Sequence, residues 1–234
     1  MIYRRFLVIF LEMICIIIDV KEDAITMFQE CLIRKEEPKD YREVENLVRE
    51  SFWNVYKPGC DEHYLLHQLR KKEDFVKDLD FVLVVEGKII GQICFVKNFI
   101  RKSDGGLLPV MTFGPISILP KYKRKGYGKL LLDYSLEKAK DLGVGAVCIE
   151  GNILFYRNSG FVVGSSLNIR YYGEPDEEDV PYFLVKELKP GYLRNVDGIY
   201  LEPLSYRIKK EDIDEFDKKF PPKIKLKLPG QLFE

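Results

Sequence analysis

This sequence has few cysteines and histidines, and it has no excess of charge of either sign. The five cysteines are odd in number, scattered and never spaced as C-x-x-C, which argues against a disulfide scaffold and against a zinc site. Lysine plus arginine and aspartate plus glutamate both number 37, so the chain has no overall field that would attract nucleic acid or anionic lipid. We therefore expect no nucleic-acid partner, a reducing cytoplasmic location, and basic sites that are only local.

A hydrophobic run long enough to cross a membrane is also lacking. The apolar stretch 6–18 is interrupted by Glu12 and is shorter than the roughly 20 residues that a bilayer core requires. No small-residue cleavage site follows it, so it resembles a secretory signal only superficially. We expect residues 1–31 to be an N-terminal extension without a membrane role, and leave open an anchor, an accessory strand or helix, and a true start at Met27.

Hydrophobic residues make up 46% of the chain, enough to bury the core of one globular domain. Their spacing predicts an α/β chain whose first helix lies against a sheet. A capping-box spacing of Asp40 and Glu43 predicts the start of the first helix, and the charged run 70–74 is expected to face solvent. Helices are predicted at 38–52, 62–75 and 127–142, a short turn or helix at 154–158, and strands at 81–85, 88–96, 107–119, 146–150, 161–170 and 182–185.

The most informative segment is a strand that runs through a lysine- and glycine-containing turn into the helix predicted at 127–142. The first turn of a helix has unpaired N–H groups and a positive dipole end, which together can hold a pyrophosphate. Gly126 and Gly128 lack the side chains that would keep the backbone away from phosphate. Nearby positive charge comes from Lys123, Arg124, Lys125 and Lys129.

Two common phosphate-binding motifs do not fit this turn. Lys129 is followed by Leu130 and not by serine or threonine, which excludes a Walker loop. Leu131 stands where a dinucleotide-binding fingerprint requires its third glycine. Taken alone, the turn is equally compatible with a flexible strand-to-helix connection that carries solvated lysines.

Read with its neighbours, the segment Ile118-x-Pro120 followed by Lys123-x-x-Gly126-x-Gly128 resembles motif A of the GNAT N-acetyltransferases. Lys123 departs from the usual glutamine or arginine. The resemblance implies that acetyl-CoA binds here, with its pantetheine on the backbone of the strand end and its pyrophosphate on the turn. The implied pantetheine residues are Ile116, Ser117 and Ile118, and the implied pyrophosphate residues are Arg124, Lys125, Gly126, Tyr127, Gly128 and Lys129.

A second segment, Tyr156-x-x-x-Gly160-Phe161, resembles motif B of the same family. This resemblance implies that Tyr156 acts as the general acid toward the departing thiolate. A buried core tyrosine with a satisfied hydroxyl is the alternative. The asparagine that many members carry seven positions before this tyrosine is replaced by Ile149. The implied fold is an acyl-CoA N-acyltransferase fold whose mixed, mostly antiparallel sheet is splayed around the strands before and after the motif A helix.

The general base is harder to assign. No carboxylate occurs in the strand 110–119, where many relatives carry a catalytic glutamate. Glu150, at the end of the next strand, is a candidate base, directly or through water, although a capping or ion-paired role fits equally well. His63 and His67 share one predicted helix, but no third ligand is apparent, so we expect no metal.

The expected function is N-acetyl transfer from acetyl-CoA to a primary amine by direct attack in a ternary complex. The acceptor is a small-molecule amine or a peptide, and the family resemblance also allows a homodimer. The alternative is a non-catalytic module that binds or senses acyl-CoA, because the strand carboxylate is missing. We expect residues 32–188 to form the acetyltransferase domain and residues 189–234 to form a C-terminal extension packed on it.

Overall fold

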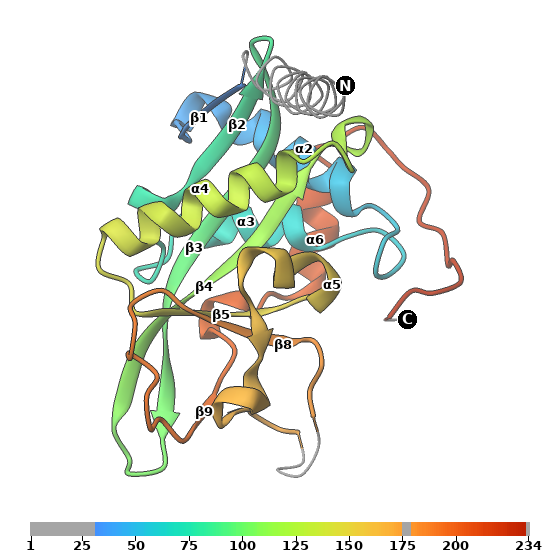
Figure 1. The fold of residues 1–234 in the computed structure, drawn as a ribbon. Helices are drawn as coiled ribbons and strands as arrows, with labels where there is room; N and C mark the ends of the chain where they lie inside the picture. Colours follow the sequence, from blue (N-terminus) through green and yellow to red (C-terminus); the bar gives the residue numbers. More distant parts are fainter. Residues whose placement is uncertain (1–30, 175–178, 233–234) are drawn as a thin grey trace, which may run out of the picture.

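The computed structural model describes residues 31–174 and 179–232 (Figure 1). The apolar stretch 6–18 and most of the expected N-terminal extension therefore lie outside the described residues. Within the described ranges no helix is both long enough and apolar enough to span a membrane.

A single sheet forms the centre of the fold, with the strand order β1-β2-β3-β4-β5-β8-β6 and with β9 joining β3 to β7. Most neighbouring strands are antiparallel, whereas β4–β5 and β7–β9 are parallel, which confirms the predicted mixed, mostly antiparallel sheet. The strands are β1 (Cys31–Lys35), β2 (Phe81–Val85), β3 (Lys88–Lys102), β4 (Leu107–Ile118), β5 (Ala146–Glu150), β6 (Val162–Val163), β7 (Ile169–Tyr171), β8 (Phe183–Glu187) and β9 (Gly198–Tyr200).

The parallel strands β4 and β5 separate soon after they meet. Their ladder has one residue pair, Met111 with Val147, although β4 continues to Ile118 and β5 to Glu150. In Figure 1, β5 runs at a steep angle away from the long β3–β4 hairpin. The carboxyl ends of the two strands therefore border a gap in the sheet, as the predicted splay requires.

An extra residue in β4 lies close to this gap. Phe113 pairs with Phe95 and Ile116 with Ile93, so three steps along β4 match two steps along β3. The additional residue falls at the cis Gly114–Pro115 peptide. A bulge of this kind bends the strand and interrupts its ladder, which helps β4 to diverge from β5.

Helices cover both faces of the sheet. Helix α4 (Tyr127–Asp141) buries Leu131, Leu132, Leu136 and Ala139 against the face that carries Ile93 and Phe95. Helices α2 (Tyr41–Phe52) and α3 (Glu62–Leu69) cover the opposite face, where Val44 and Leu66 pack with Cys94 and Val96. This arrangement buries β3 on both faces from Ile89 to Val96.

The first helix does not begin with the predicted capping box. The side chain of Asp40 caps no N–H group of α2; it accepts hydrogen bonds from Arg34 at 2.5 and 3.0 Å and from the Glu37 N–H at 2.9 Å. A 3-10 turn over Pro38–Asp40 leads into α2. The capping box therefore lies one turn earlier than predicted, between Glu37 and Asp40, and the ion pair of Asp40 with Arg34 on β1 ties this turn to the sheet.

Helix α3 ends at Leu69, six residues earlier than predicted, and the charged run that follows is not fully solvated. Arg70 is buried and donates to Glu36 at 2.6 and 2.9 Å and to Glu45 at 2.9 Å. Phe75 forms a bridge with Val96, and the Val76 N–H donates to Phe95 O. These contacts with the sheet draw the chain out of the helix.

The predicted strand 161–170 is divided into β6, a 3-10 turn (Gly164–Leu167) and β7. Gly164 lies against Phe183, whose ring would be 2.3 Å from a Cβ at this position. Asn168 ends the turn with a φ of 56°. The close approach to β8 therefore bends the segment, and the sequence pattern of alternating residues does not reveal it.

The C-terminal residues contain more regular structure than their weak periodicity suggested. Strand β9 pairs with β3 through Ile100 and Tyr200, and helix α6 (Lys210–Asp217) packs beside α3. Residues 221–228 then run in an extended conformation across the surface. The boundaries expected at residues 31 and 188 stay predictions.

A buried carboxyl near β2 gives a stability prediction. Burial, and then the neighbouring Glu36, raise the pKa of Asp80 well above its usual range, and Asp80 Oδ1 has no hydrogen-bond partner within the described residues. The folded chain thus keeps a proton that the unfolded chain releases near pH 4, so unfolding free energy is lost as the pH rises above that value. Asp80→Asn should therefore melt progressively higher than wild type between pH 5 and pH 9. A constant difference in Tm would contradict this account.

Candidate active site

The carboxyl end of β4 directs alternate backbone groups toward the gap in the sheet. The Leu119 N–H donates to Ile90 O at 2.8 Å, which makes Ile118–Gly91 a non-hydrogen-bonded pair in the antiparallel ladder. By alternation, the N–H and C=O groups of Ser117 point toward β3, whereas those of Ile116 and Ile118 point away from it. The three residues predicted to hold pantetheine therefore do not present their backbone in the same direction.

Ser117 has a second feature that the sequence did not reveal. Its side chain is buried, and its Oγ has no hydrogen-bond partner within the part of the chain that the structure describes. On the neighbouring residue, Ile118 O lies 3.0 Å from the hydroxyl of Ser51, in the last turn of α2, which shares its one proton between Ile118 O and Leu47 O at 2.8 Å. The end of α2 is therefore fastened to the end of β4.

The turn between β4 and α4 holds the helix start open. Arg124 and Gly126 have φ values of 62° and 85°, and Gly126 is the N-terminal cap of α4 without offering a side chain to the first N–H groups. The first intrahelical bond runs from the Leu130 N–H to Gly126 O at 3.0 Å. This is the geometry of a helix terminus whose first N–H groups are directed at the surrounding space.

Gly128 connects three elements at one place. A Cβ at this position would lie 3.5 Å from the ring of Phe155 and 3.7 Å from Ile118 Cγ1. The start of α4, the end of β4 and helix α5 (Ile153–Tyr156) therefore surround the same small space. The structure thus brings together the two segments that resemble motifs A and B.

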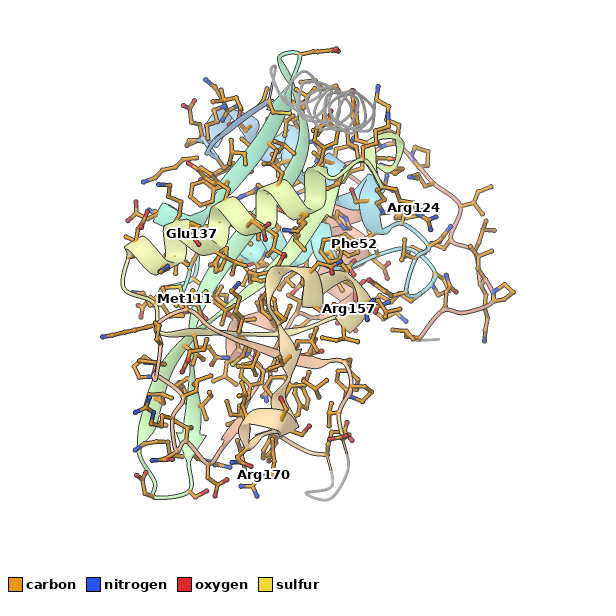
Figure 2. The ribbon with its side chains drawn as sticks, viewed as in Figure 1. Phe52, Met111, Arg124, Glu137, Arg157 and Arg170 are labelled. Atoms are coloured by element: carbon orange, nitrogen blue, oxygen red, sulfur yellow. The ribbon has the colours of Figure 1, made fainter. Side chains whose placement is uncertain are left out.

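The basic residues of the turn have different roles. The ammonium of Lys123 donates to Ser51 O at 2.9 Å, and burial lowers its pKa, so it caps the carboxyl end of α2. Lys129 forms an ion pair with Asp133. Arg124 and Lys125 are exposed and form no ion pair with any described residue; Figure 2 shows Arg124 at the turn that precedes α4. Mobile positive charge at the helix start therefore comes mainly from these two side chains.

Tyr156 combines a buried ring with an unpaired hydroxyl. Its ring packs on Phe113 and Phe161 with centroid distances of 5.9 and 5.6 Å, and it occupies the space left by the missing side chain of Gly151. Burial raises its pKa, with a smaller contribution from Tyr56. The described chain offers the hydroxyl no hydrogen-bond partner. The ring therefore fits the core interpretation, whereas the hydroxyl does not.

Glu150 lies exposed at the end of β5 and accepts a hydrogen bond from the hydroxyl of Tyr171 at 2.7 Å. It forms no ion pair with a described residue, and the adjacent short helix α5 is capped by Asn152. Burial, and then the bond to Glu150, raise the pKa of Tyr171. Neither the capping nor the ion-paired alternative for Glu150 is present.

The sequence interpretation missed several residues beside these candidates. Glu202 follows β9, and its pKa is raised by burial and by the charge of Glu150. Tyr206 donates to Gly114 O at 3.1 Å, in the bulge of β4, and Tyr56 makes a small contribution to the raised pKa of Tyr156. No local motif marks them, since they reach the site from the C-terminal extension and from the connection after α2.

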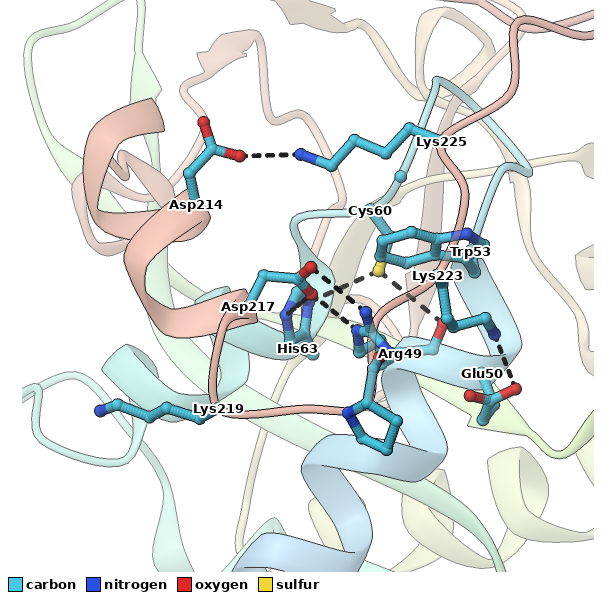
Figure 3. Close-up of polar contacts among 12 residues, drawn as sticks. Arg49, Glu50, Trp53, Cys60, His63, Asp214, Asp217, Lys219, Lys223 and Lys225 are labelled. Carbon is cyan, nitrogen blue, oxygen red and sulfur yellow. Dashed lines mark hydrogen bonds and ion pairs between the residues drawn. The ribbon is translucent and has the colours of Figure 1, made fainter.

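The two histidines of α3 do not converge on a common site. His63 is buried, with Nε2 at 3.2 Å from Asp217 and Nδ1 at 3.4 Å from Cys60 Sγ (Figure 3). His67 Nδ1 lies 2.8 Å from Glu45. No group of three or more potential metal ligands occurs among the described side chains.

Known proteins resemble this chain in sequence and in fold. It is 29% identical over 169 residues to the "Uncharacterized N-acetyltransferase YhbS" of Escherichia coli K12, covering 72% of this chain and 93% of that protein. A crystal structure of YhbS from E. coli in complex with CoA has a TM-score of 0.65 at 24% identity, covering 76% of this chain and 92% of that one. A GNAT family acetyltransferase from Brucella melitensis in complex with acetyl-CoA has a TM-score of 0.59 at 22% identity, covering 76% and 98%.

The family itself is established by a match along the chain. Residues 41–161, just over half of the sequence, match the model of the acetyltransferase (GNAT) family. This range includes both α2 and the two segments that resemble motifs A and B, which confirms the family predicted from them. The chain therefore belongs to the GNAT family of acetyltransferases.

Proposed function

We propose that this protein transfers the acetyl group of acetyl-CoA to a primary amine, on a small molecule or a peptide, by direct attack in a ternary complex. The observation that carries the proposal is the meeting of Ile118, Gly128 and Phe155 around the uncapped start of α4. Residues 32–188 would form the catalytic domain, with residues 1–31 and 189–234 as extensions.

The chain's own groups suit the co-substrate at each position. The backbone groups of Ile116 and the N–H group of Ile118 point away from β3, toward the side of the gap between β4 and β5, where an amide-containing pantetheine needs hydrogen-bond partners; Ile118 O already contacts Ser51. The turn from Arg124 to Lys129 leads into the start of α4, where the backbone N–H groups of Gly128 and Lys129 and the positive end of the helix dipole suit the pyrophosphate, with two exposed cations nearby. Ser117 would contribute less than predicted, because its backbone pairs with β3. Acetyl-CoA supplies the activated acyl group, and the protein supplies position and proton transfer.

The proton transfers can be assigned to two side chains. An alkylammonium acceptor has a pKa of about 10.4 and must lose a proton before it can attack, and exposed Glu150 is the candidate to accept it, directly or through water. The amine nitrogen then bonds to the acetyl carbon as the C–S bond breaks, and the nitrogen releases its second proton to water to give the neutral amide. Tyr156 is the candidate to donate its proton to the departing thiolate and to regain it from water, because its hydroxyl has no hydrogen-bond partner in the described chain and a phenol is protonated at neutral pH.

A direct test measures thiol release from acetyl-CoA in the presence of polyamines, amino acids, aminoglycosides and peptides. The proposal predicts saturable release with at least one amine, together with an acetylated product. The missing carboxylate in β4 favours one alternative, a module that binds or senses acyl-CoA without turnover. Tight coenzyme A binding without amine-dependent thiol release across the whole panel would support that alternative and contradict the enzyme.

Glu150→Gln tests the proposed base. The amide keeps the shape and can still accept from Tyr171, but it cannot take a proton, so kcat/KM should fall by about tenfold to a hundredfold. The loss should shrink as the pH rises, because more of the amine is then already neutral. Glu202→Gln is the matched comparison on the neighbouring carboxyl. An unchanged rate for Glu150→Gln, with a fall for Glu202→Gln, would move the base to Glu202.

A further inference from the structure

The C-terminal extension brings two tyrosine hydroxyls to strand β4. Strand β9 ends at Tyr200, whose hydroxyl lies 2.8 Å from Thr112 Oγ1. A short 3-10 turn then ends at Tyr206, whose hydroxyl donates to Gly114 O at 3.1 Å. Both tyrosines lie beyond residues 41–161, the part of the chain that matches the family model. A segment outside the family match therefore bonds to β4 at two nearby positions.

The two contacts differ in their place relative to the bulge of β4. Thr112 belongs to the regular ladder between β3 and β4. Gly114 and Pro115 are the residues of β4 that have no partner of their own in the described ladder between these strands. Tyr206 therefore contacts the bulge itself, whereas Tyr200 contacts the regular strand that precedes it.

Side chains lie within hydrogen-bond distance of both carbonyl groups of the bulge. Gly114 O accepts from the Tyr206 hydroxyl at 3.1 Å and from Cys94 Sγ at 3.3 Å. The amide of the buried Gln92 can donate to Pro115 O at 3.3 Å while its oxygen accepts from the Cys94 N–H at 3.2 Å. A thiol is a weak donor. Tyr206 is therefore the stronger of the two side-chain donors to the Gly114 carbonyl.

The bulge decides the direction in which Ile116 turns its backbone. The N–H and C=O groups of a strand alternate in direction from one residue to the next. Without the extra residue, Pro115 would stand opposite Ile93, and Ile116 would direct its N–H and C=O groups toward β3. With the extra residue, Ile116 stands opposite Ile93 and directs these groups away from β3. The bulge thus makes the Ile116 backbone available on the side where we propose that pantetheine binds.

Tyr206 is itself held in place by packing and by its own turn. Its ring packs against the hydrophobic cluster that α2 and α3 form with the sheet, and its N–H donates to Pro203 O at 3.0 Å. A Cβ at Gly114 would lie 3.1 Å from the Tyr206 hydroxyl oxygen. The hydroxyl therefore fills the space beside the bulge as well as bonding to it.

We propose that Tyr206 is a positioning residue for the co-substrate: its hydroxyl holds the bulge of β4, and the bulge directs the Ile116 backbone at pantetheine. In this role Tyr206 acts through Gly114 and need not touch the co-substrate. Part of the pantetheine site is thus maintained by the C-terminal extension. The inference rests on the proposed binding of acetyl-CoA, but it does not depend on transfer to an amine.

Tyr206→Phe is the decisive variant, because it keeps the ring and removes only the hydroxyl. The Kd for coenzyme A, measured by isothermal titration calorimetry on the full chain, should rise by about tenfold. The Kd for adenosine 3′,5′-bisphosphate, which lacks the pantetheine arm, should stay within about twofold. Cys94→Ala removes the weaker donor to the same carbonyl, so it should raise the coenzyme A Kd by a smaller factor and tests the contact without changing Tyr206.

Tyr200→Phe is the matched control. It removes a buried hydroxyl from the same extension, but the lost contact is with Thr112 in the regular ladder. Both tyrosine variants should lower the Tm, since each leaves a polar group of β4 with one partner fewer. Only Tyr206→Phe should weaken the binding of coenzyme A. The pair of variants therefore separates positioning of the site from general stability.

Three outcomes would overturn the inference. An unchanged coenzyme A Kd in Tyr206→Phe would show that the hydroxyl does not position the site. An equal rise in Tyr200→Phe would assign the effect to lost stability. An equal rise for the bisphosphate in Tyr206→Phe would place the effect away from pantetheine.

Failure of the proposed function gives a different result. A wild-type protein that does not bind coenzyme A would remove the proposed function and this inference together. Binding of coenzyme A without acetylation of any amine would remove the transfer reaction alone, and the comparison of Tyr206→Phe with Tyr200→Phe would still decide the role of Tyr206.

Discussion

Gly128→Leu is expected to raise the Kd for coenzyme A by about a hundredfold without destabilising the protein. A Cβ at Gly128 would already be in van der Waals contact with Phe155 and Ile118, so the rest of a leucine side chain must enter the space proposed for the cofactor. The backbone of Gly128 is helical, and leucine favours a helix over glycine by up to about 1 kcal/mol. Isothermal titration calorimetry and thermal unfolding should therefore show weaker binding with an equal or higher Tm.

Gly143→Ala is the matched control at the other end of α4. Its φ of 82° strains any residue with a side chain, but no atom lies within 4 Å of the added Cβ. This variant should lose stability, by about 1 kcal/mol, and keep its affinity for coenzyme A. The two glycines thus predict opposite patterns. Wild-type affinity in Gly128→Leu would show that the cofactor does not pass between α4 and α5.

Tyr156→Phe is expected to lower kcat by about tenfold to a hundredfold while the coenzyme A Kd stays the same. The effect is kept moderate because a thiol has a pKa of about 8.5, so the thiolate can leave without full protonation. Removal of this hydroxyl breaks no hydrogen bond in the described structure, so the Tm should not fall. Steady-state kinetics and calorimetry on the same preparation separate the two effects.

Tyr134→Phe serves as a control for the loss of a phenol. Tyr134 lies on α4, and its ring packs edge-on against Phe81 at 5.3 Å, away from the gap between β4 and β5. This variant should retain wild-type kcat and Kd. Equal turnover of Tyr156→Phe and wild type would remove Tyr156 from the mechanism. A large rise in the coenzyme A Kd for Tyr156→Phe would instead make it a binding residue.

The elements that the sequence predicted well are those set by local signals. Helix α4 was expected at 127–142 and occurs at Tyr127–Asp141, because Gly126 permits the left-handed cap and Gly143 ends the helix with a positive φ. The hairpin through Glu86 and Gly87 also forms as predicted, and both residues have positive φ values. In each case the residues that determine the local structure lie within the short segment itself.

The predictions that failed depended on distant partners. Arg70 was expected in solvent, but Glu36 on the segment after β1 and Glu45 on α2 surround it, and neither is a neighbour in sequence. Lys123 was interpreted as mobile charge for phosphate, whereas the Ser51 carbonyl binds it. The bulge of β4 depends on its register with β3, which one strand alone does not specify.

The residues of the candidate site show the same difference between local signals and distant partners. The turn from Arg124 to Lys129 could be predicted, because its glycines and basic residues are consecutive. Glu202 and Tyr206 could not, because they reach the site from the C-terminal extension and carry no motif. The course of residues 223–228 could not be predicted either: lysines alternate with apolar residues as in a half-buried strand, yet Ile224, Leu226 and Leu228 are exposed.

The account depends above all on where the pyrophosphate of coenzyme A binds, and a crystal structure of the complex measures this directly. We predict pyrophosphate oxygens within about 3 Å of backbone N–H groups between Arg124 and Lys129, with the pantetheine against Ile116 and Ile118. A complex in which those N–H groups bond to other protein atoms, with the pyrophosphate bound elsewhere, would contradict it.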